Sequence, residues 1–129
     1  MGLDTITNKI KNLFNSSNNN DDFFTLRKLR SNLPVNLFID TNHKWYNKSE
    51  DYYVIKVQNN LNDIAEYKHS FSITISEEPK VIESKIEIAL SDTEQRLVKK
   101  FIKQNIEKLI KVANKEIDIF EFLDSFKAL

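Results

Sequence analysis

The chain has 129 residues, of which 40% are hydrophobic, and this is enough to build one domain around one core. Its 19 basic and 19 acidic residues balance, so no chain-wide charge attracts nucleic acids or anionic membranes, and any partner must be recognised locally. The chain has no cysteine and no apolar run of signal-peptide or membrane-spanning length, which excludes disulfides and thiolate chemistry and predicts a cytoplasmic protein without membrane contact.

Residues 1–22 are predicted to form an N-terminal amphipathic helix and a linker. The apolar residues of the helix recur every three or four positions and line one side of it: Leu3, Ile6, Ile10, Leu13 and Phe14. The Asn- and Ser-rich residues 15–22 bond their own backbone and interrupt the helix, so they are interpreted as a linker. The helix either packs on its own domain or docks on a partner or a second copy, which would make a homodimer.

From residue 23 to about residue 90, apolar and polar residues alternate, and β-branched and aromatic residues are frequent. This pattern predicts four or five strands of a small antiparallel β-meander. Pro34 disfavours helix before the second strand, and Pro79 presets a turn before the last one. The expected strands are residues 23–30, where a helical turn is the alternative, then 35–40, 52–58, 70–76 and 81–88.

The last third of the chain is predicted to be helical. Ser91 and Glu94 have the spacing of a capping box, which predicts a long helix over residues 92–113. Its apolar residues, including Phe101, line one side and are expected in the core, while lysines cover the other side.

A second helix start follows at Asp118, which has Glu121 three residues later, and predicts a helix over residues 119–127. The expected fold is therefore α+β. One domain over residues 23–129 has the meander with these two C-terminal helices packed on one face.

The segment between the second and third predicted strands collects aromatic and polar side chains. Asn42 tolerates left-handed conformations, so residues 41–44 are the expected chain reversal, and residues 40–51 are interpreted as a connection at the sheet edge. Large flat side chains with a polar tip are frequent at protein interfaces, although such side chains can also fill a core. The candidate protein-binding residues are Trp45, Tyr46, Tyr52 and Tyr53.

A nucleic-acid or nucleotide binder is the alternative function. Arg27, Lys28 and Arg30, together with the lysines of the long helix, could neutralise phosphates. Glutamates interrupt the lysine face and the chain is neutral, so a solvated surface is the favoured interpretation of these charges.

A small hydrolytic toxin that uses Asp40 and His43 is the second alternative. Hydrolysis would also require a third orienting group and a preorganised place for developing charge, and the single glycine, Gly2, excludes a glycine-rich phosphate loop. The two histidines, His43 and His69, lie too far apart in the sequence to indicate a metal site. We therefore expect no enzymatic activity, no cofactor and no metal.

The stretches LPVNLFID, VIKVQNN, SITISEEPKVIESKIEIALSDTEQ and EIDIFEFLDSF carry a resemblance that spans residues 33–126. Their order resembles an uncharacterised family of short proteins carried by phages, plasmids and conjugative elements of low-GC bacteria. The resemblance implies no known activity, but it implies a setting in which small neutral proteins bind host proteins or proteins of competing elements. The predicted function is non-enzymatic protein binding, with an anti-defence or inhibitor role as its extension.

Overall fold

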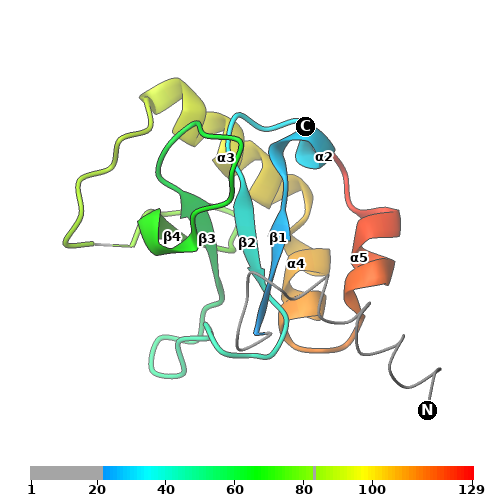
Figure 1. Cartoon of the computed structure of the whole chain (residues 1–129). Coiled ribbons are helices and arrows are strands. Elements are labelled where there is room, and N and C mark those ends of the chain that lie inside the picture. Colours follow the sequence, from blue (N-terminus) through cyan, green and yellow to red (C-terminus); the bar gives the residue numbers. More distant parts are fainter. Residues whose placement is uncertain (1–21, 83) are drawn as a thin grey trace, which may run out of the picture.

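The computed structural model describes residues 22–82 and 84–129 and contains a four-stranded antiparallel sheet with helices (Figure 1). The strands lie in chain order in the sheet: β1 (Phe23–Leu26), β2 (Leu37–Asp40), β3 (Val54–Gln58) and β4 (Ser70–Thr74). The predicted α+β fold with an antiparallel meander is therefore confirmed. The predicted N-terminal amphipathic helix, and with it the predicted homodimer contact, lies outside the described residues.

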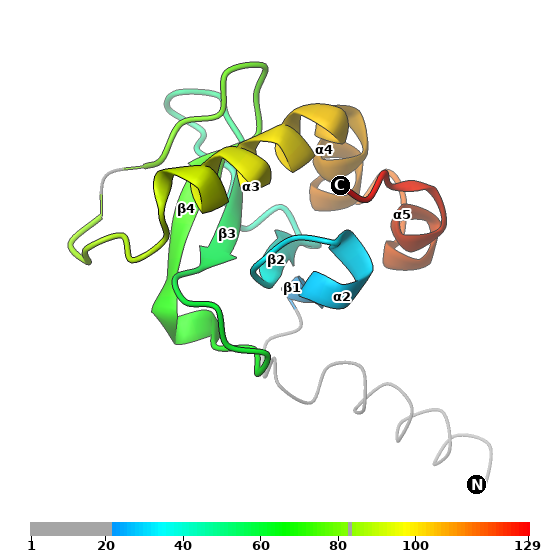
Figure 2. The ribbon, with the colours of Figure 1, turned by 90° about the horizontal axis from the view of Figure 1, so that it is seen from above.

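The longer helices follow the sheet in the sequence. They are α3 (Asp92–Gln104), α4 (Ile106–Ala113) and α5 (Ile119–Ser125). Figure 2 shows α3 and α4 along one face of the sheet and α5 beside them, and α4 contacts both β2 and α5. Shorter helical turns are α2 (Lys28–Ser31) and η1 (Tyr67–His69), so the first predicted strand region contains both alternatives, β1 and then a helical turn. None of the helices in the described part of the chain is long and apolar enough to cross a membrane.

Alternate side chains of the sheet face these helices and form the core. Leu37 lies opposite Val57, and Ile55 lies opposite Ile73, so their side chains share one face. The helices contribute the other half of the core, with fully or almost fully buried side chains at Val98, Phe101, Ile102, Leu109, Val112 and Phe122.

Both predicted helix starts are confirmed. The Ser91 hydroxyl accepts the backbone N–H of Glu94 at 3.1 Å, and the Glu94 carboxylate accepts the backbone N–H of Ser91 at 2.8 Å. The Asp118 carboxylate accepts the backbone N–H of Glu121 at 2.8 Å at the start of α5. These local bonds satisfy N–H groups that the first turn of a helix leaves without partners.

The prediction of one continuous helix over residues 92–113 is wrong, because Asn105 separates α3 from α4. The Asn105 side chain donates to the Phe101 carbonyl at 2.9 Å, which is the carbonyl that the backbone N–H of residue 105 would use in an uninterrupted helix. That N–H instead bonds the Ile102 carbonyl at 3.1 Å. The same side chain accepts from the Lys127 N–H at 2.7 Å and donates to the Lys127 carbonyl at 2.9 Å, so the break also holds the C-terminal tail, residues 126–129.

The prediction of a strand over residues 81–88 is also wrong. Among the described residues of this segment, the pairing with β4 consists of an isolated bridge from Val81 to Ile73 and the Ile82 N–H on the Ser72 carbonyl at 2.8 Å. The Asn59 side chain hydrogen-bonds the backbone at the end of this segment. It donates to the Glu87 carbonyl and accepts the Ala89 N–H, each at 2.7 Å. A side chain thus replaces the strand partner that the alternating sequence predicted.

The core position of Phe101 gives a stability prediction. Its side chain is fully buried, so Phe101→Ala should lower the free energy of unfolding by about 3–5 kcal/mol. The matched control is Lys100→Ala, at the exposed neighbouring position, which should change it by less than about 0.5 kcal/mol. Urea denaturation measures both, and a loss below about 1 kcal/mol for Phe101→Ala would contradict this description of the core.

Candidate functional site

The face of the sheet turned away from α3 and α4 is covered by two loops. The side chains of Asn36, Phe38 and Asp40 alternate with the core residues of β2 and therefore point to this outer face. They are nevertheless almost completely buried, with exposed fractions of 0, 1 and 2%. The loops that bury them contain the candidate binding residues.

Asp40 anchors the first loop. One oxygen of its carboxylate accepts the backbone N–H groups of Asn42 at 2.9 Å and Lys44 at 3.2 Å, and the other accepts that of Trp45 at 2.9 Å. Residues 41–43 bend the chain, and the left-handed residue there is His43, with φ of 54°, and not Asn42. The hydrogen-bonded reversal lies later than predicted, at residues 48–51 between the bridged Asn47 and Tyr52. The backbone N–H of His43 donates to the Ala113 carbonyl at 2.8 Å, and this bond fixes the bend to the end of α4.

Trp45 lies over the outer face as part of an aromatic layer. Its ring centroid is 5.6 Å from that of Phe23 and 6.1 Å from that of Tyr67, and the Lys56 ammonium lies 4.9 Å from the Trp45 ring. Phe23 and Tyr67 stack at 4.3 Å and both meet the buried Phe38 edge to face. Trp45 is therefore a half-buried residue that packs on its own chain.

The predicted tyrosines lie elsewhere. Tyr53 is on the helix side of the sheet, in alternation with Ile55, and its ring lies 4.6 Å from that of Tyr46. The hydroxyl of Tyr46 donates to the Asp51 carboxylate, which raises the pKa of Tyr46, and burial is the first cause that raises the pKa of Tyr53. Tyr52 accepts a hydrogen bond from the Asn47 side chain at 3.1 Å. The four candidate residues thus do not form one patch.

The second loop, residues 59–66, is held from below by Gln58, which the sequence analysis did not single out. The Gln58 side chain is fully buried on the outer face. Its amide nitrogen lies 3.3 Å from the Asn62 carbonyl and 3.0 Å from the Ile64 carbonyl, and its amide oxygen accepts the Glu66 N–H at 2.8 Å. The available signal in the sequence was an uncharged polar residue at the end of a strand whose other residues are apolar except for Lys56.

Asn36 extends this support to α2. Its side chain donates to the Asp63 carbonyl at 3.2 Å and accepts the backbone N–H of Lys28 at 3.0 Å. The Lys28 ammonium then donates to the Leu61 carbonyl at 2.7 Å and pairs with the Asp63 carboxylate at 2.6 Å. The loop backbone is therefore fixed by side chains at several positions along its length.

The fixed loop presents large aliphatic side chains to solvent. Leu61 is 49% exposed and Ile64 is 76% exposed, beside a surface hollow of about 690 Å³ that Glu66 also lines. Glu66 lines a second hollow as well, of about 290 Å³, together with Ile86, which is 44% exposed. We name Leu61, Ile64 and Ile86 the apolar loop surface.

The predicted basic residues separate into two kinds. Arg27 and Arg30 are exposed. Lys28 instead forms a clamp on the second loop through its bonds to the Leu61 carbonyl and the Asp63 carboxylate. Hydrogen bonding and the charge of Lys28 hold the pKa of Asp63 below its usual range. Lys28 thus neutralises a carboxylate of its own chain.

The residues of the hydrolytic alternative have structural contacts. Both oxygens of the buried Asp40 carboxylate accept backbone N–H groups, and the exposed His43 packs its ring 4.8 Å from that of Tyr46. Among residues 22–82 and 84–129, no group of three or more His, Cys, Asp or Glu side chains could hold a metal ion.

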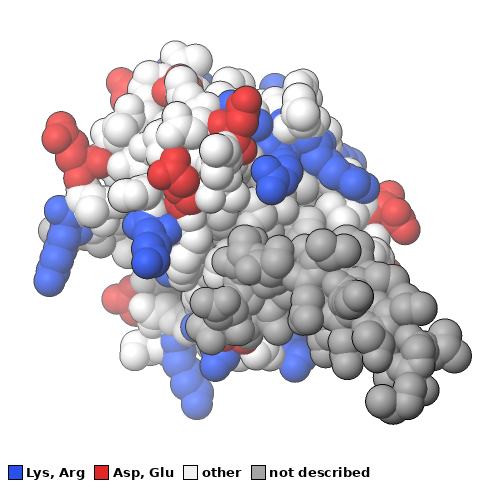
Figure 3. Space-filling view, viewed as in Figure 1, with Lys and Arg blue, Asp and Glu red and all other residues white. Residues whose placement is uncertain are grey.

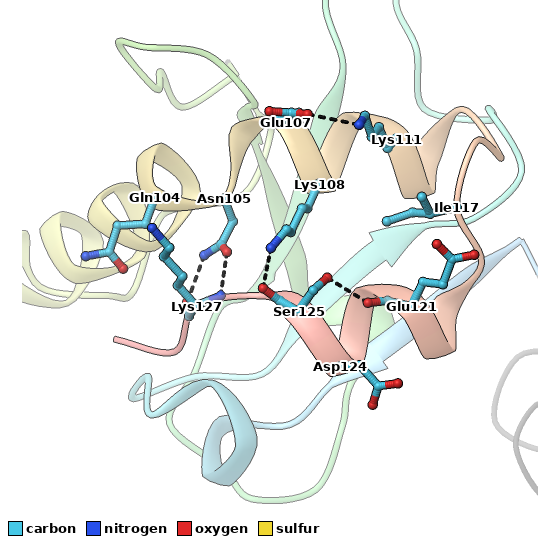
Figure 4. Close-up of a pocket in the computed structure, with 10 residues that line it drawn as sticks. All are labelled: Gln104, Asn105, Glu107, Lys108, Lys111, Ile117, Glu121, Asp124, Ser125 and Lys127. Atoms are coloured by element: carbon cyan, nitrogen blue, oxygen red, sulfur yellow. Dashed lines mark hydrogen bonds and ion pairs between the residues drawn. The ribbon is translucent and has the colours of Figure 1, made fainter.

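A third hollow, of about 570 Å³, lies between α4 and α5, and Figure 4 shows its lining. Three of its charged groups contact the protein itself, because Glu107 pairs with Lys111 at 2.9 Å and Lys108 donates to the Ser125 carbonyl. Within the described residues, no buried side-chain polar atom lacks a hydrogen-bond partner. The hollow therefore shows no polar group that a ligand is needed to satisfy.

Comparison of the chain with family models, curated proteins and solved structures gives no match. The resemblance described from the sequence stays a prediction, and the contacts above carry the functional argument.

The role of Asp40 can be tested with the only tryptophan of the chain as a local reporter. Asp40→Asn replaces an acceptor oxygen with a donor group, so it should lower the free energy of unfolding by about 2 kcal/mol, since hydrogen bonds to charged groups contribute about 1.5–3 kcal/mol. Release of the turn should also shift the Trp45 emission to longer wavelength. The exposed Asp124→Asn is the control, and unchanged stability and emission in Asp40→Asn would contradict the anchoring role.

Proposed function

We propose that this is a non-enzymatic binding protein and that it holds another protein against the apolar loop surface. The observation that carries the proposal is the combination of a fixed backbone and exposed aliphatic side chains in residues 59–66. Gln58, Asn36 and Lys28 bond this backbone, yet Leu61 and Ile64 remain 49% and 76% exposed.

The energetics of binding support this choice. Association loses affinity when side chains and loops must be ordered, and a loop that is already fixed avoids most of that cost. Removing a large aliphatic side chain from water contributes about 1.5–3 kcal/mol, so Leu61 and Ile64 could anchor an interface. Polar groups of Asn62 and Glu66 surround them, as a polar rim surrounds the apolar centre of an interface. The expected partner is a protein with a small apolar groove.

The aromatic segment has a supporting part in this proposal. The Trp45 ring packs on the Lys56 ammonium and on the ring of Tyr67, the residue that directly follows the loop. Trp45 thus stabilises the end of the loop that carries Leu61 and Ile64. Tyr46, Tyr52 and Tyr53 lie in contacts with their own segment. An anti-defence or inhibitor role on a mobile element or phage is an extension that rests on the sequence resemblance alone.

Comparative affinity capture tests the proposal. The tagged protein and its Leu61→Ser/Ile64→Ser variant should both fold, because these side chains are exposed, and only the unaltered protein should retain the partner from a low-GC bacterial lysate. With the partner purified, the double variant should lose about 2 kcal/mol or more of binding free energy by calorimetry, as substitutions at interface hot spots do.

Phe120→Ser on α5 is the matched control, because Phe120 is 57% exposed and lies outside the apolar loop surface. It should retain the partner with unchanged affinity. Capture of the same proteins by the double variant, or capture of none by the unaltered protein, would refute the proposal.

A further inference from the structure

The exposed face of α3 begins with Asp92 in its first turn, and every charged residue that follows on this face is basic. Three lysines follow Arg96 at spacings of three, four and seven positions, and these spacings place them on the same side of the helix as Arg96: Lys99, Lys100 and Lys103. The opposite side is buried in the core through Val98, Phe101 and Ile102. Over about 10 Å of helix, at 1.5 Å per residue, this face presents four cations.

The break at Asn105 separates Glu107 from the basic residues of α3. A continuous helix would bring Glu107 into the lysine row, and this interruption, together with the neutral charge of the chain, favoured an ordinary solvated surface. In the structure Glu107 belongs to α4 and pairs with Lys111 at 2.9 Å. No acidic residue lies between Glu94 and Glu107 in the sequence, so the basic row of α3 is uninterrupted.

The C-terminal tail and α2 extend the row. The Asn105 side chain bonds the Lys127 backbone, the Leu129 N–H donates to the Ser31 carbonyl at 2.9 Å, and the Asn32 side chain donates to the Leu129 carbonyl at 3.0 Å. Figure 2 shows α3, the end of the chain and α2 next to one another, and Figure 3 shows Lys and Arg gathered over the end that carries α2. We name this surface the basic end; its residues are Arg27, Arg30, Arg96, Lys99, Lys100, Lys103 and Lys127.

The ion pairs found in the described part of the chain do not use these residues. Those pairs join Lys28 to Asp63, His69 to Glu66 and Lys111 to Glu107. A chain that is neutral overall therefore concentrates positive charge at one end, where it can act on a charged partner at short range.

We infer that the basic end binds the phosphate backbone of double-stranded nucleic acid without reading its sequence. Lysine and arginine side chains that neutralise phosphates release condensed counterions, and this supplies most of the free energy of sequence-independent binding. The row on α3 is held by a packed helix, and a rigid row of cations suits the regular phosphates of a duplex. The exposed face of α3 has no aromatic ring on which unpaired bases could stack, so single strands have no added contact.

Membrane surfaces and acidic proteins fit this surface less well. A helix that lies on a membrane inserts its apolar side, but Val98, Phe101 and Ile102 of α3 are buried in the core. A protein interface of ordinary affinity has apolar or aromatic residues at its centre, and the row on α3 consists of charged side chains.

The test is fluorescence anisotropy with a labelled 20-base-pair DNA duplex and the full chain, and it compares two triple variants of equal charge. Lys100→Gln/Lys103→Gln/Lys127→Gln removes three exposed cations from the basic end. Lys44→Gln/Lys48→Gln/Lys80→Gln removes three exposed cations from other parts of the surface. Circular dichroism and thermal melting should show that both variants fold like the unaltered protein.

The unaltered protein should bind the duplex at 50 mM salt, and its affinity should fall steeply as salt rises. The basic-end variant should lose at least about tenfold in affinity at 50 mM salt, and its plot of log K against log salt should be shallower by about 2.7, since each phosphate contact contributes about 0.9. The control variant should lose less than about threefold, with an unchanged salt slope.

Three results would overturn the inference. They are absence of duplex binding at 50 mM salt, equal loss in the two triple variants, and competition by poly-glutamate or anionic phospholipid vesicles that matches competition by unlabelled duplex at equal charge. The second would reduce the effect to net charge, and the third would assign the surface to acidic proteins or to membranes. Poorer competition by a single strand than by the duplex would support the inference.

Discussion

The burial of β2 on both faces is the constraint on which the rest of this structure depends. Its core face packs under the helices, and its outer face places Asn36, Phe38 and Asp40 where water does not reach. Burying an amide or a carboxylate is unfavourable unless its hydrogen bonds are made, so loops must pass over them with their backbone groups at bonding distance. Asp40 therefore sets the path of the turn after β2, and Asn36 and Gln58 set the path of the loop after β3. The proposed binding surface is a consequence of these hydrogen bonds, because it lies on the loop after β3.

Side-chain amides have the same role at the joints between helices and tail. The Asn105 side chain hydrogen-bonds the Phe101 carbonyl of the helix and the backbone N–H and carbonyl of Lys127 in the tail. These three bonds end α3, redirect α4 and bring the tail beside α2. The charge distribution follows from this geometry, because the break removes Glu107 from the lysine row and the tail adds Lys127 to it. One asparagine thus determines both the shape and the electrostatics of this end of the molecule.

The sequence predicts well those features that depend on neighbours in the chain. Alternation identified the strands of the sheet, and the spacing of Ser91 and Glu94 located the start of α3, because each signal lies within a few residues. The error at residues 81–88 comes from hydrogen bonds of the Asn59 side-chain amide to positions 28 and 30 residues away, which no local pattern reveals. At Asn105 a local hydrogen bond to the Phe101 carbonyl combines with bonds to Lys127, 22 residues away. The aromatic segment was recognised as a connection, but the face that each ring takes depends on the turn that Asp40 closes, and so its rings divide between two sides of the sheet.

Lys28 shows how structure limits function on α2. Among three neighbouring basic residues it alone reaches the β3–β4 loop, where it satisfies the Leu61 carbonyl and neutralises Asp63. Because this pairing lowers the pKa of Asp63, the contribution of the pair to stability is present above the ordinary carboxylate pKa and disappears only as pH falls through the lowered value. At neutral pH the ion pair between Lys28 and Asp63 is therefore formed, and Lys28 holds the loop that carries Leu61 and Ile64. Arg27 and Arg30 of the same segment stay exposed to a partner. The two proposed surfaces can consequently be altered separately, since one depends on exposed arginines and lysines and the other on a backbone that Lys28 helps to fix.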